Sequence, residues 1–168
     1  MTEERLARIA DSVVRAIQSS ADVKSSAFGL KQARQLIQKV EEKAKTMGLN
    51  IVVAVSDAAA RPIAVECMDD VYIASYDVAI NKAFTVVALK MSTKKLSTLA
   101  APGGSLYGIQ FTNDGKIVIF GGGDPLVYNG KIIGGLGVSG GTEEQDTALS
   151  AFGASAFEQI VKNFRKDV

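Results

Sequence analysis

Hydrophobic residues recur every three or four positions in four stretches of the chain, at residues 6–17, 30–47, 75–91 and 149–164. In the first, second and last of these stretches the spacing places them on one face of an α-helix, so we expect helices there. Residues 75–91 also predict a helix, but one that is apolar nearly all round and therefore buried on more than one side. Gly48 is suited to end the second helix in a left-handed conformation. Ser92 is a typical N-cap for a shorter helix, and Thr142 with Gln145 forms the capping box that opens the last one.

Two other patterns predict β-strands. A run of β-branched residues at 51–55 is typical of a buried strand, and alternation at 63–67 indicates a strand with one face on the core. The short connection between them favours an antiparallel pair. Further strands are expected at 117–120, 126–128 and 131–133, with Asn129-Gly130 as the type I′ turn of a hairpin. The chain is therefore expected to be an α+β protein with five strands.

The composition is that of a globular protein, with 47% hydrophobic and 22% charged residues over a length of 168 that fits one domain. The net charge of +1 gives no reason to expect a nucleic acid or an anionic membrane as partner. The acidic start of the chain is unlike a signal peptide, and no apolar run is long enough to span a bilayer. We therefore expect a cytoplasmic protein.

The chain contains no histidine and one cysteine, Cys67. The absence of histidine excludes Ser-His-Asp and Cys-His catalysis within this chain, and it excludes haem held by histidine. Cys67 and Met68 could still be ligands to a tetrapyrrole iron, although packing in the core is the role we expect for both. The identity of any cofactor stays open.

Residues 135–140 read Gly-Leu-Gly-Val-Ser-Gly, which matches the dinucleotide fingerprint by letter. That mechanism needs a βαβ unit with an acidic residue on the following strand, and no strand follows the last helix. The glycines are better explained by close passage of the backbone beside another element. The turn at Ser139, Gly140 and Gly141 also precedes a capped helix, whose free N–H groups favour an anion.

Several short strings, in order and spacing, resemble the GlcG/HbpS/PduO C-terminal-like family from about Leu30 to the end of the chain. They are Val55-Ser56-Asp57, Met68-Asp69, Lys82-Ala83-Phe84-Thr85, Ser92-Thr93, Gly122-Gly123-Asp124-Pro125-Leu126, and residues 134–141 with Asp146. The resemblance implies a single domain over residues 1–168 with a profilin-like three-layer α/β/α fold and a five-stranded antiparallel sheet. Residues 1–27 would then be an N-terminal helical extension.

The resemblance implies function only loosely. Members occur beside glycolate, corrinoid and diol-utilisation genes, some bind haem, and the family is generally oligomeric. This chain also departs from the pattern, because Cys67 stands where arginine is common and Asp124 stands where an apolar residue is usual. The missing arginine removes a natural clamp for a carboxylate or phosphate.

The candidate ligand-binding residues are Asp57, Asp69, Lys82, Thr85, Gly122, Gly123, Ser139, Gly140 and Gly141. Lys82 is the most informative, because a lysine among apolar residues on a buried helix needs a carboxylate or an anionic ligand. A structural ion pair with Asp57 or Asp69 is the simpler expectation. Asp69 could bind a cation through oxygen, but adjacent acids in a loop are mostly solvated, and we expect no metal site.

Three functions remain open. The leading one is a non-catalytic binding or accessory protein for a small anionic metabolite or a tetrapyrrole cofactor, linked to diol, glycolate or corrinoid metabolism. A bacterial microcompartment within the cytoplasm is one location that this function allows. The others are an enzyme of unassigned reaction that uses Lys82 and Asp57, and a purely oligomeric scaffold. A pocket that holds Lys82 would favour binding or catalysis, whereas a Lys82 enclosed by carboxylates would favour the scaffold. In each case we expect a homo-oligomer.

Overall fold

The structure, a computed structural model, describes residue 11 and residues 28–164. The helix expected over residues 6–17, and the extension expected over residues 1–27, lie outside the described residues except at residue 11. The elements are helices α2 (Leu30–Thr46), α3 (Ser75–Ala88), α4 (Thr93–Ala100) and α5 (Glu143–Phe164), and strands β1 (Val52–Asp57), β2 (Pro62–Cys67), β3 (Gly123–Tyr128) and β4 (Lys131–Ser139). Two short 3₁₀ turns, Ile109–Phe111 and Asn113–Gly115, lie between α4 and β3.

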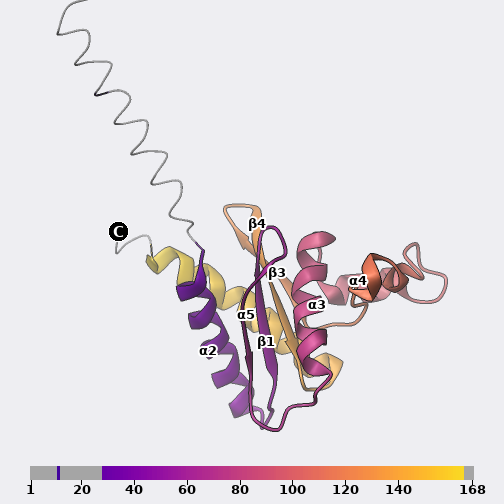
Figure 1. Ribbon diagram of the computed structural model, residues 1–168, viewed down its shortest axis with the longest axis horizontal. Coiled ribbons are helices and arrows are strands. Elements are labelled where there is room, and N and C mark those ends of the chain that lie inside the picture. The colour runs from indigo at the N-terminus through magenta and orange to yellow at the C-terminus, as the bar shows by residue number, and fades with distance from the viewer. Residues whose placement is uncertain (1–10, 12–27, 165–168) are drawn as a thin grey trace, which may run out of the picture.

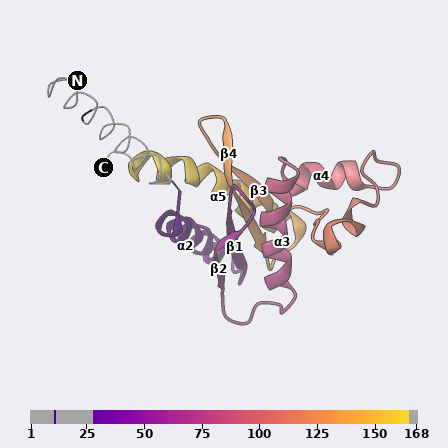
Figure 2. The same ribbon diagram turned by 45° about the horizontal axis from the view of Figure 1, so that its top comes forward.

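The strands form one antiparallel sheet in the order β2-β1-β4-β3, with α2 and α5 on one face and α3 on the other (Figures 1 and 2). The α+β class and the antiparallel β1–β2 pair are confirmed. Alternate residues of β1 face opposite layers: Val53 and Val55 join the cluster with α2 and α5, while Val52 and Ala54 pack on α3. The sheet is thus buried on both faces along its central strands.

The expectation of a fifth strand was wrong, because the sheet of the described residues has four. Residues 117–119 have no regular secondary structure, and residue 120 is a bend before β3. Ile117 and Val118 are buried there, and the Val118 amide donates to Thr85 Oγ1 of α3 at 3.0 Å instead of to a neighbouring strand. The neighbouring edge strand also carries Pro125, which has no N–H to offer a ladder. Burial without pairing explains why the apolar run reads as a strand.

The local signals at the element ends are confirmed. Gly48 has φ +67°, and the Lys95 amide donates to Ser92 Oγ at 3.2 Å. The Thr142 amide donates to Gln145 Oε1 at 2.9 Å, while the Gln145 amide donates to Thr142 Oγ1 at 3.3 Å. Asn129 and Gly130 have φ of +49° and +72°, as a type I′ turn requires.

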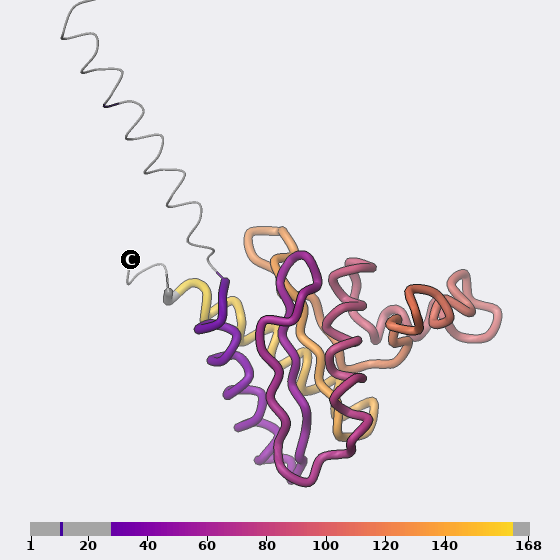
Figure 3. The backbone as a smooth tube through the Cα atoms, in the orientation of Figure 1, coloured from indigo at the N-terminus to yellow at the C-terminus, as the bar shows by residue number. Residues whose placement is uncertain are grey.

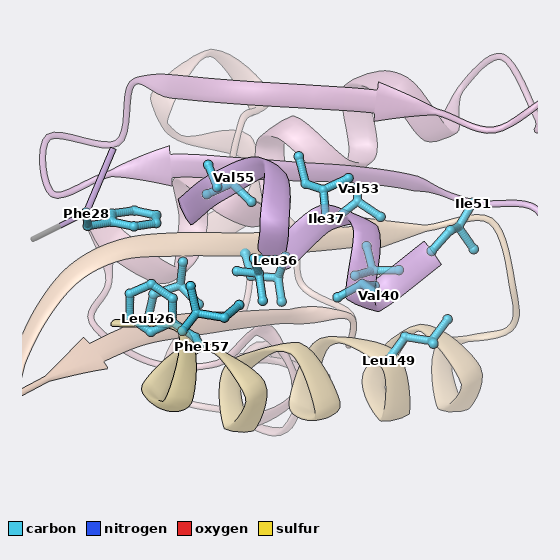
Figure 4. Packing of buried hydrophobic residues seen from close by; sticks show 14 of the residues in the cluster. Phe28, Leu36, Ile37, Val40, Ile51, Val53, Val55, Leu126, Leu149 and Phe157 are labelled. Atoms are coloured by element: carbon cyan, nitrogen blue, oxygen red, sulfur yellow. The ribbon is translucent and has the colours of Figure 1, made fainter. Parts of the chain in front are cut away.

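The main core lies between the sheet and the pair α2 and α5 (Figure 4). Figure 4 labels the large members: Phe28, Leu36, Ile37, Val40, Ile51, Val53, Val55, Leu126, Leu149 and Phe157. Phe28 and Phe157 meet edge to face with ring centroids 5.0 Å apart, which ties the start of α2 to α5. This cluster is larger than the one between the sheet and α3, which contains Val52, Ala54, Ala79 and Ala83.

Glycines in β4 let helix α3 lie directly against the sheet backbone. A Cβ added at Gly137 would collide with the Ala79 carbonyl oxygen, and one at Gly135 would collide with that of Ala83. Gly137 is flanked in the sheet by Ala54 and Gly123, so α3 lies over a row of small residues. Close packing of a helix on the sheet therefore explains Gly135 and Gly137 of the glycine-rich motif. This is the explanation that the sequence favoured over dinucleotide binding.

Cys67 and Met68, which we expected to pack in the core, lie at the outer edge of the sheet. Cys67 ends β2, which is an edge strand, and its side chain is exposed instead of packing in the core. Met68 is half-buried and packs against the main cluster. The packing expected for Met68 is therefore confirmed, whereas that expected for Cys67 was wrong, because Cys67 ends an edge strand.

Large apolar side chains are exposed at two places on the α3 side of the molecule. Tyr72, Ile73 and Tyr76 lie at the start of α3 and are 77%, 96% and 48% exposed. Tyr107 and Phe111 lie on the segment after α4, which projects from the body (Figure 3), and are 65% and 85% exposed. Apolar surface of this extent is typical of an interface between protein chains.

We predict that the protein forms a homo-oligomer, at least a dimer, that covers these aromatic side chains. Light scattering at micromolar concentration should give a mass of at least twice 17.7 kDa. Replacing Ile73 with Lys should shift the assembly toward the monomer, whereas Lys39→Gln on the exposed side of α2 should leave it unchanged. A monomeric parent protein would contradict the prediction.

Candidate functional site

Lys82 is fully buried on α3, as the sequence predicts, and its ammonium group is held entirely by the protein. Its Nζ donates to the Val138 carbonyl oxygen at 2.7 Å and to Asp146 Oδ2 at 2.9 Å. The ring of Phe120 lies 4.9 Å from Nζ and adds a cation–π contact. The expectation that Asp57 or Asp69 forms the ion pair with Lys82 was wrong. The carboxylate that neutralises Lys82 belongs to Asp146, in the first turn of α5.

The loop before β3 leaves room for this pair only because it contains glycine. Gly122 has φ +108°, and a Cβ there would lie 2.5 Å from Lys82 Nζ and 2.8 Å from the Val138 oxygen. Gly123 faces the stem of Lys82 in the same way. The structure therefore brings Lys82, Gly122 and Gly123 together beside the end of β4, as the sequence predicts.

The glycine turn after β4 faces the same pair, but a side chain of the protein already occupies its donors. The Gly141 amide of this turn donates to Asp146 Oδ1 at 2.9 Å. In the neighbouring loop before β3, the Gly121 amide donates to Glu143 Oε1 at 2.9 Å. Asp146 is 3% exposed. The anion predicted at Ser139, Gly140 and Gly141 is thus supplied by the protein itself, in the form of the Asp146 carboxylate.

Burial governs the ionisation of this pair. Burial lowers the pKa of Lys82, and the charge of Asp146 opposes that shift. Burial likewise raises the pKa of Asp146, against the charge of Lys82 and the hydrogen bond from Gly141. Each partner depends on the other for its charge, so removal of one should neutralise or destabilise the other.

Thr85, one turn along α3, has a structural contact. Its Oγ1 donates to the Asn81 carbonyl oxygen at 2.7 Å and accepts from the Val118 amide at 3.0 Å. It therefore holds the unpaired segment 117–120 against α3. Phe120, at the end of that segment, covers the ammonium group of Lys82.

Asp57 lies at the other end of the sheet, where it organises the turn between β1 and β2. Its Oδ1 accepts from the amides of Ala59 and Arg61 at 2.8 and 2.9 Å, and its Oδ2 pairs with the Arg61 guanidinium at 2.7 Å. Partial burial would raise the pKa of Asp57, but the hydrogen bonds from Arg61 and Ala59 outweigh it and the pKa is lowered. Asp57 therefore has a structural role in the turn between β1 and β2.

Lys82 and Asp57 do not form an acid–base pair. Asp57 is in register with Gly134, four residues before Val138 on β4, which corresponds to about 13 Å at about 3.3 Å per residue. The side chain of Asp57 shares the sheet face of Val53 and Val55, whereas α3 packs on the other face. Asp69 is exposed in the loop after β2, and the described residues include no group of three or more His, Cys, Asp or Glu placed to hold a metal ion.

Asp124 is a half-buried acid, and it has no cation beside it in the contacts of the described chain. Ser150 Oγ of α5 donates to Asp124 Oδ2 at 2.6 Å. Burial raises the pKa of Asp124, and the Ser150 hydrogen bond only partly offsets it. Its partly buried environment favours the neutral form of the carboxyl group.

A hollow of about 730 Å³ opens at the end of the sheet where the β1–β2 turn and the β3–β4 hairpin lie together (Figure 1). We call it the turn-end hollow; its lining residues are Phe28, Gly29, Asp57, Ala58, Ala59, Arg61, Ile63, Tyr128, Asn129, Lys131 and Ile133. Its volume lies within the range of about 300–1,000 Å³ typical of small-molecule sites. Of the predicted site residues it contains Asp57 alone, and the sequence gave no sign of the hollow because its walls come from three separate parts of the chain.

The four-stranded sheet with helices on both faces makes this a small, layered α+β protein. The family model for haem-degrading HbpS-like proteins matches residues 28–155, so the chain belongs to the HbpS-like family. An uncharacterised 15.0 kDa protein from the dhaT-dhaS intergenic region of Citrobacter freundii is 41% identical over 131 residues, which is 78% of this chain and 92% of that protein.

Two kinds of relative add detail. The corrinoid adenosyltransferase PduO of Salmonella typhimurium is 38% identical over 74% of this chain, but the match spans only 37% of that enzyme. Among solved structures, Klebsiella pneumoniae protein ORFY aligns over 77% of this chain and 90% of its own length, with a TM-score of 0.75 and 38% identity. A PduOC–haem complex aligns over 77% and 94%, with a TM-score of 0.74 and 36% identity.

Removing the charge of Lys82 should test whether it is structural. We predict that Lys82→Met lowers the free energy of unfolding by about 3–5 kcal/mol at neutral pH, because the Asp146 carboxylate loses its cation while buried. The loss should shrink in mildly acidic solution, where protonation removes that charge. Urea unfolding measures both effects.

The matched control is the double variant Lys82→Met/Asp146→Leu, which removes both charges and should recover most of the stability. Unchanged stability of Lys82→Met, together with lost thermal shifts from added carboxylates or phosphates, would instead show that Lys82 serves a ligand.

Two acids should affect stability in opposite directions. The pKa of Asp124 is raised on folding, so the native state binds the extra proton and stability falls as pH rises above the unfolded value. The pKa of Asp57 is lowered, so its contribution is present above the unfolded value and is lost as pH falls through the folded value.

Asp124→Asn should therefore raise the melting temperature at neutral pH, and Asp57→Asn should lower it. The Asp124→Asn difference should vanish below the ordinary aspartate pKa, where that carboxyl is protonated in both states. The Asp57→Asn difference should vanish only below the lowered folded-state pKa of Asp57. A neutral-pH loss of stability in Asp124→Asn would mean that its carboxylate is a stabilising anion.

Proposed function

We propose that this chain is a non-catalytic accessory protein that binds a tetrapyrrole-class ligand or a small acidic metabolite in the turn-end hollow. The observation that carries the proposal is the hollow itself, an apolar-walled space of cofactor size that is separate from the buried ion pair. Phe28, Ile63 and Ile133 supply apolar wall, and Arg61 and Lys131 supply positive charge beside it.

The contacts of Lys82 argue against the enzyme that would use Lys82 with Asp57. An acid–base catalyst needs both groups within reach of one substrate, and these two lie on opposite faces near opposite ends of β4. Enclosure of Lys82 by Asp146 was the result expected for a scaffold protein, so a scaffold is the second candidate. The exposed aromatic side chains at the start of α3 favour it as well.

The relatives support the tetrapyrrole class. The PduOC structure is a complex with haem, and the matching enzymes are corrinoid adenosyltransferases. Because this chain has no histidine, the ligand would be held by shape, apolar contact and charge, and not by histidine ligation of iron. A metal-free porphyrin would then serve as well as haem.

We further propose that the protein acts in the cytoplasm beside the enzymes of diol or corrinoid metabolism, within a bacterial microcompartment. Similarity to the corrinoid adenosyltransferases supports this location. Among the residues that the structure describes, no helix combines the length and apolar character needed to cross a membrane.

Titration with protoporphyrin IX and with haemin, followed by tyrosine fluorescence and visible absorbance, tests the proposal. Both ligands should bind saturably and with similar affinity, because the iron has no histidine to bind. Absence of saturable binding to either would contradict the proposed ligand class and favour the scaffold. Haemin binding that is far tighter than porphyrin binding, with a shifted Soret band, would contradict binding without iron ligation.

A further inference from the structure

The two turns that border the turn-end hollow each carry a cation. Arg61 ends the β1–β2 turn and Lys131 begins β4, directly after the hairpin turn. Asp57 and Gly134 are paired across β1 and β4, so both turns leave the sheet at the same end, as Figures 1 and 3 show. Both cations line the hollow, with Asp57 as its one acidic residue, which leaves a net charge of +1 (two cations minus one anion).

Asp57 holds the guanidinium group of Arg61 in place, and part of that group stays exposed to solvent. Its Nε and Nη2 atoms both contact Asp57 Oδ2, at 2.9 and 2.7 Å. Asp57 is itself fixed by two backbone amides of the turn. The side chain of Arg61 remains 79% exposed, so the other N–H groups of its guanidinium can donate to an acid group that arrives from solvent.

The interior of the hollow differs in character from this charged border. Phe28 packs edge to face on Phe157 and is 7% exposed, which fixes its ring as wall. Ile63 and Ile133 are half-buried and pack against the main core. A ligand that fits must therefore combine an apolar body with an acid group at one end.

We infer that the turn-end hollow binds its ligand by an acid group paired with Arg61 and Lys131, while the apolar body of the ligand lies against Phe28, Ile63 and Ile133. Asp57 is a positioning residue that orients the guanidinium of Arg61. This inference rests on the proposed function and deepens it, because it names the part of the ligand that is recognised. Carboxylated apolar molecules are bound, and their neutral esters are discriminated against.

A matched pair of ligands tests the inference: protoporphyrin IX, with two carboxylic acids, and its dimethyl ester, with the same ring and no acid. The parent protein should bind the diacid about tenfold more tightly than the ester, which corresponds to about 1.4 kcal/mol. Arg61→Gln and Lys131→Gln should each weaken diacid binding and leave ester binding unchanged. Lys39→Gln removes the same charge from an exposed part of α2 and should change neither.

Each outcome has a distinct meaning. Equal binding of diacid and ester by the parent protein would overturn the acid pairing but leave the proposed function standing. Diacid preference that survives in both glutamine variants would overturn the assignment to Arg61 and Lys131. Failure of both ligands to bind would overturn the proposed function and this inference with it. Lys131→Gln keeps the test valid if Arg61→Gln disturbs the turn.

Discussion

The ion pair between Lys82 and Asp146 is the constraint on which the rest of the structure depends. Lys82 comes from the helix on one face of the sheet, and Asp146 comes from the helix that packs on the other. Both meet at the end of β4, where Val138 supplies a carbonyl oxygen. Two buried charges are tolerated only when fully paired, so the positions of α3, α5 and the Gly122 loop are fixed together.

This constraint accounts for three glycines around the end of β4. Gly135 and Gly137 bring α3 close to the sheet, and Gly122 leaves space for the ammonium group. The charged and glycine-rich features that first suggest a ligand site therefore form a closed structural unit. In the proposed function, ligand recognition takes place in the turn-end hollow, where the cations are exposed and the wall is apolar.

Local features of the fold were predictable from the sequence, and long-range ones were not. The capping box at Thr142 and the Asn129-Gly130 turn depend on adjacent residues, so their patterns identify them. The burial of Lys82 followed from its apolar neighbours, but its partner lies 64 residues away, and an acid in the first turn of a helix reads as ordinary capping. The run at 117–120 was expected as a strand because periodicity reports burial and not pairing. The hollow has no local pattern at all.

Amide chemical-shift mapping with protoporphyrin IX tests most directly whether binding and the buried ion pair are separate. The account predicts shifts at the β1–β2 turn from Asp57 to Ile63 and at the hairpin from Tyr128 to Ile133, with residues 121–123 and 139–141 unchanged. Shifts confined to residues 121–123 and 139–141 would contradict it, because they would place the ligand against Lys82 and Asp146.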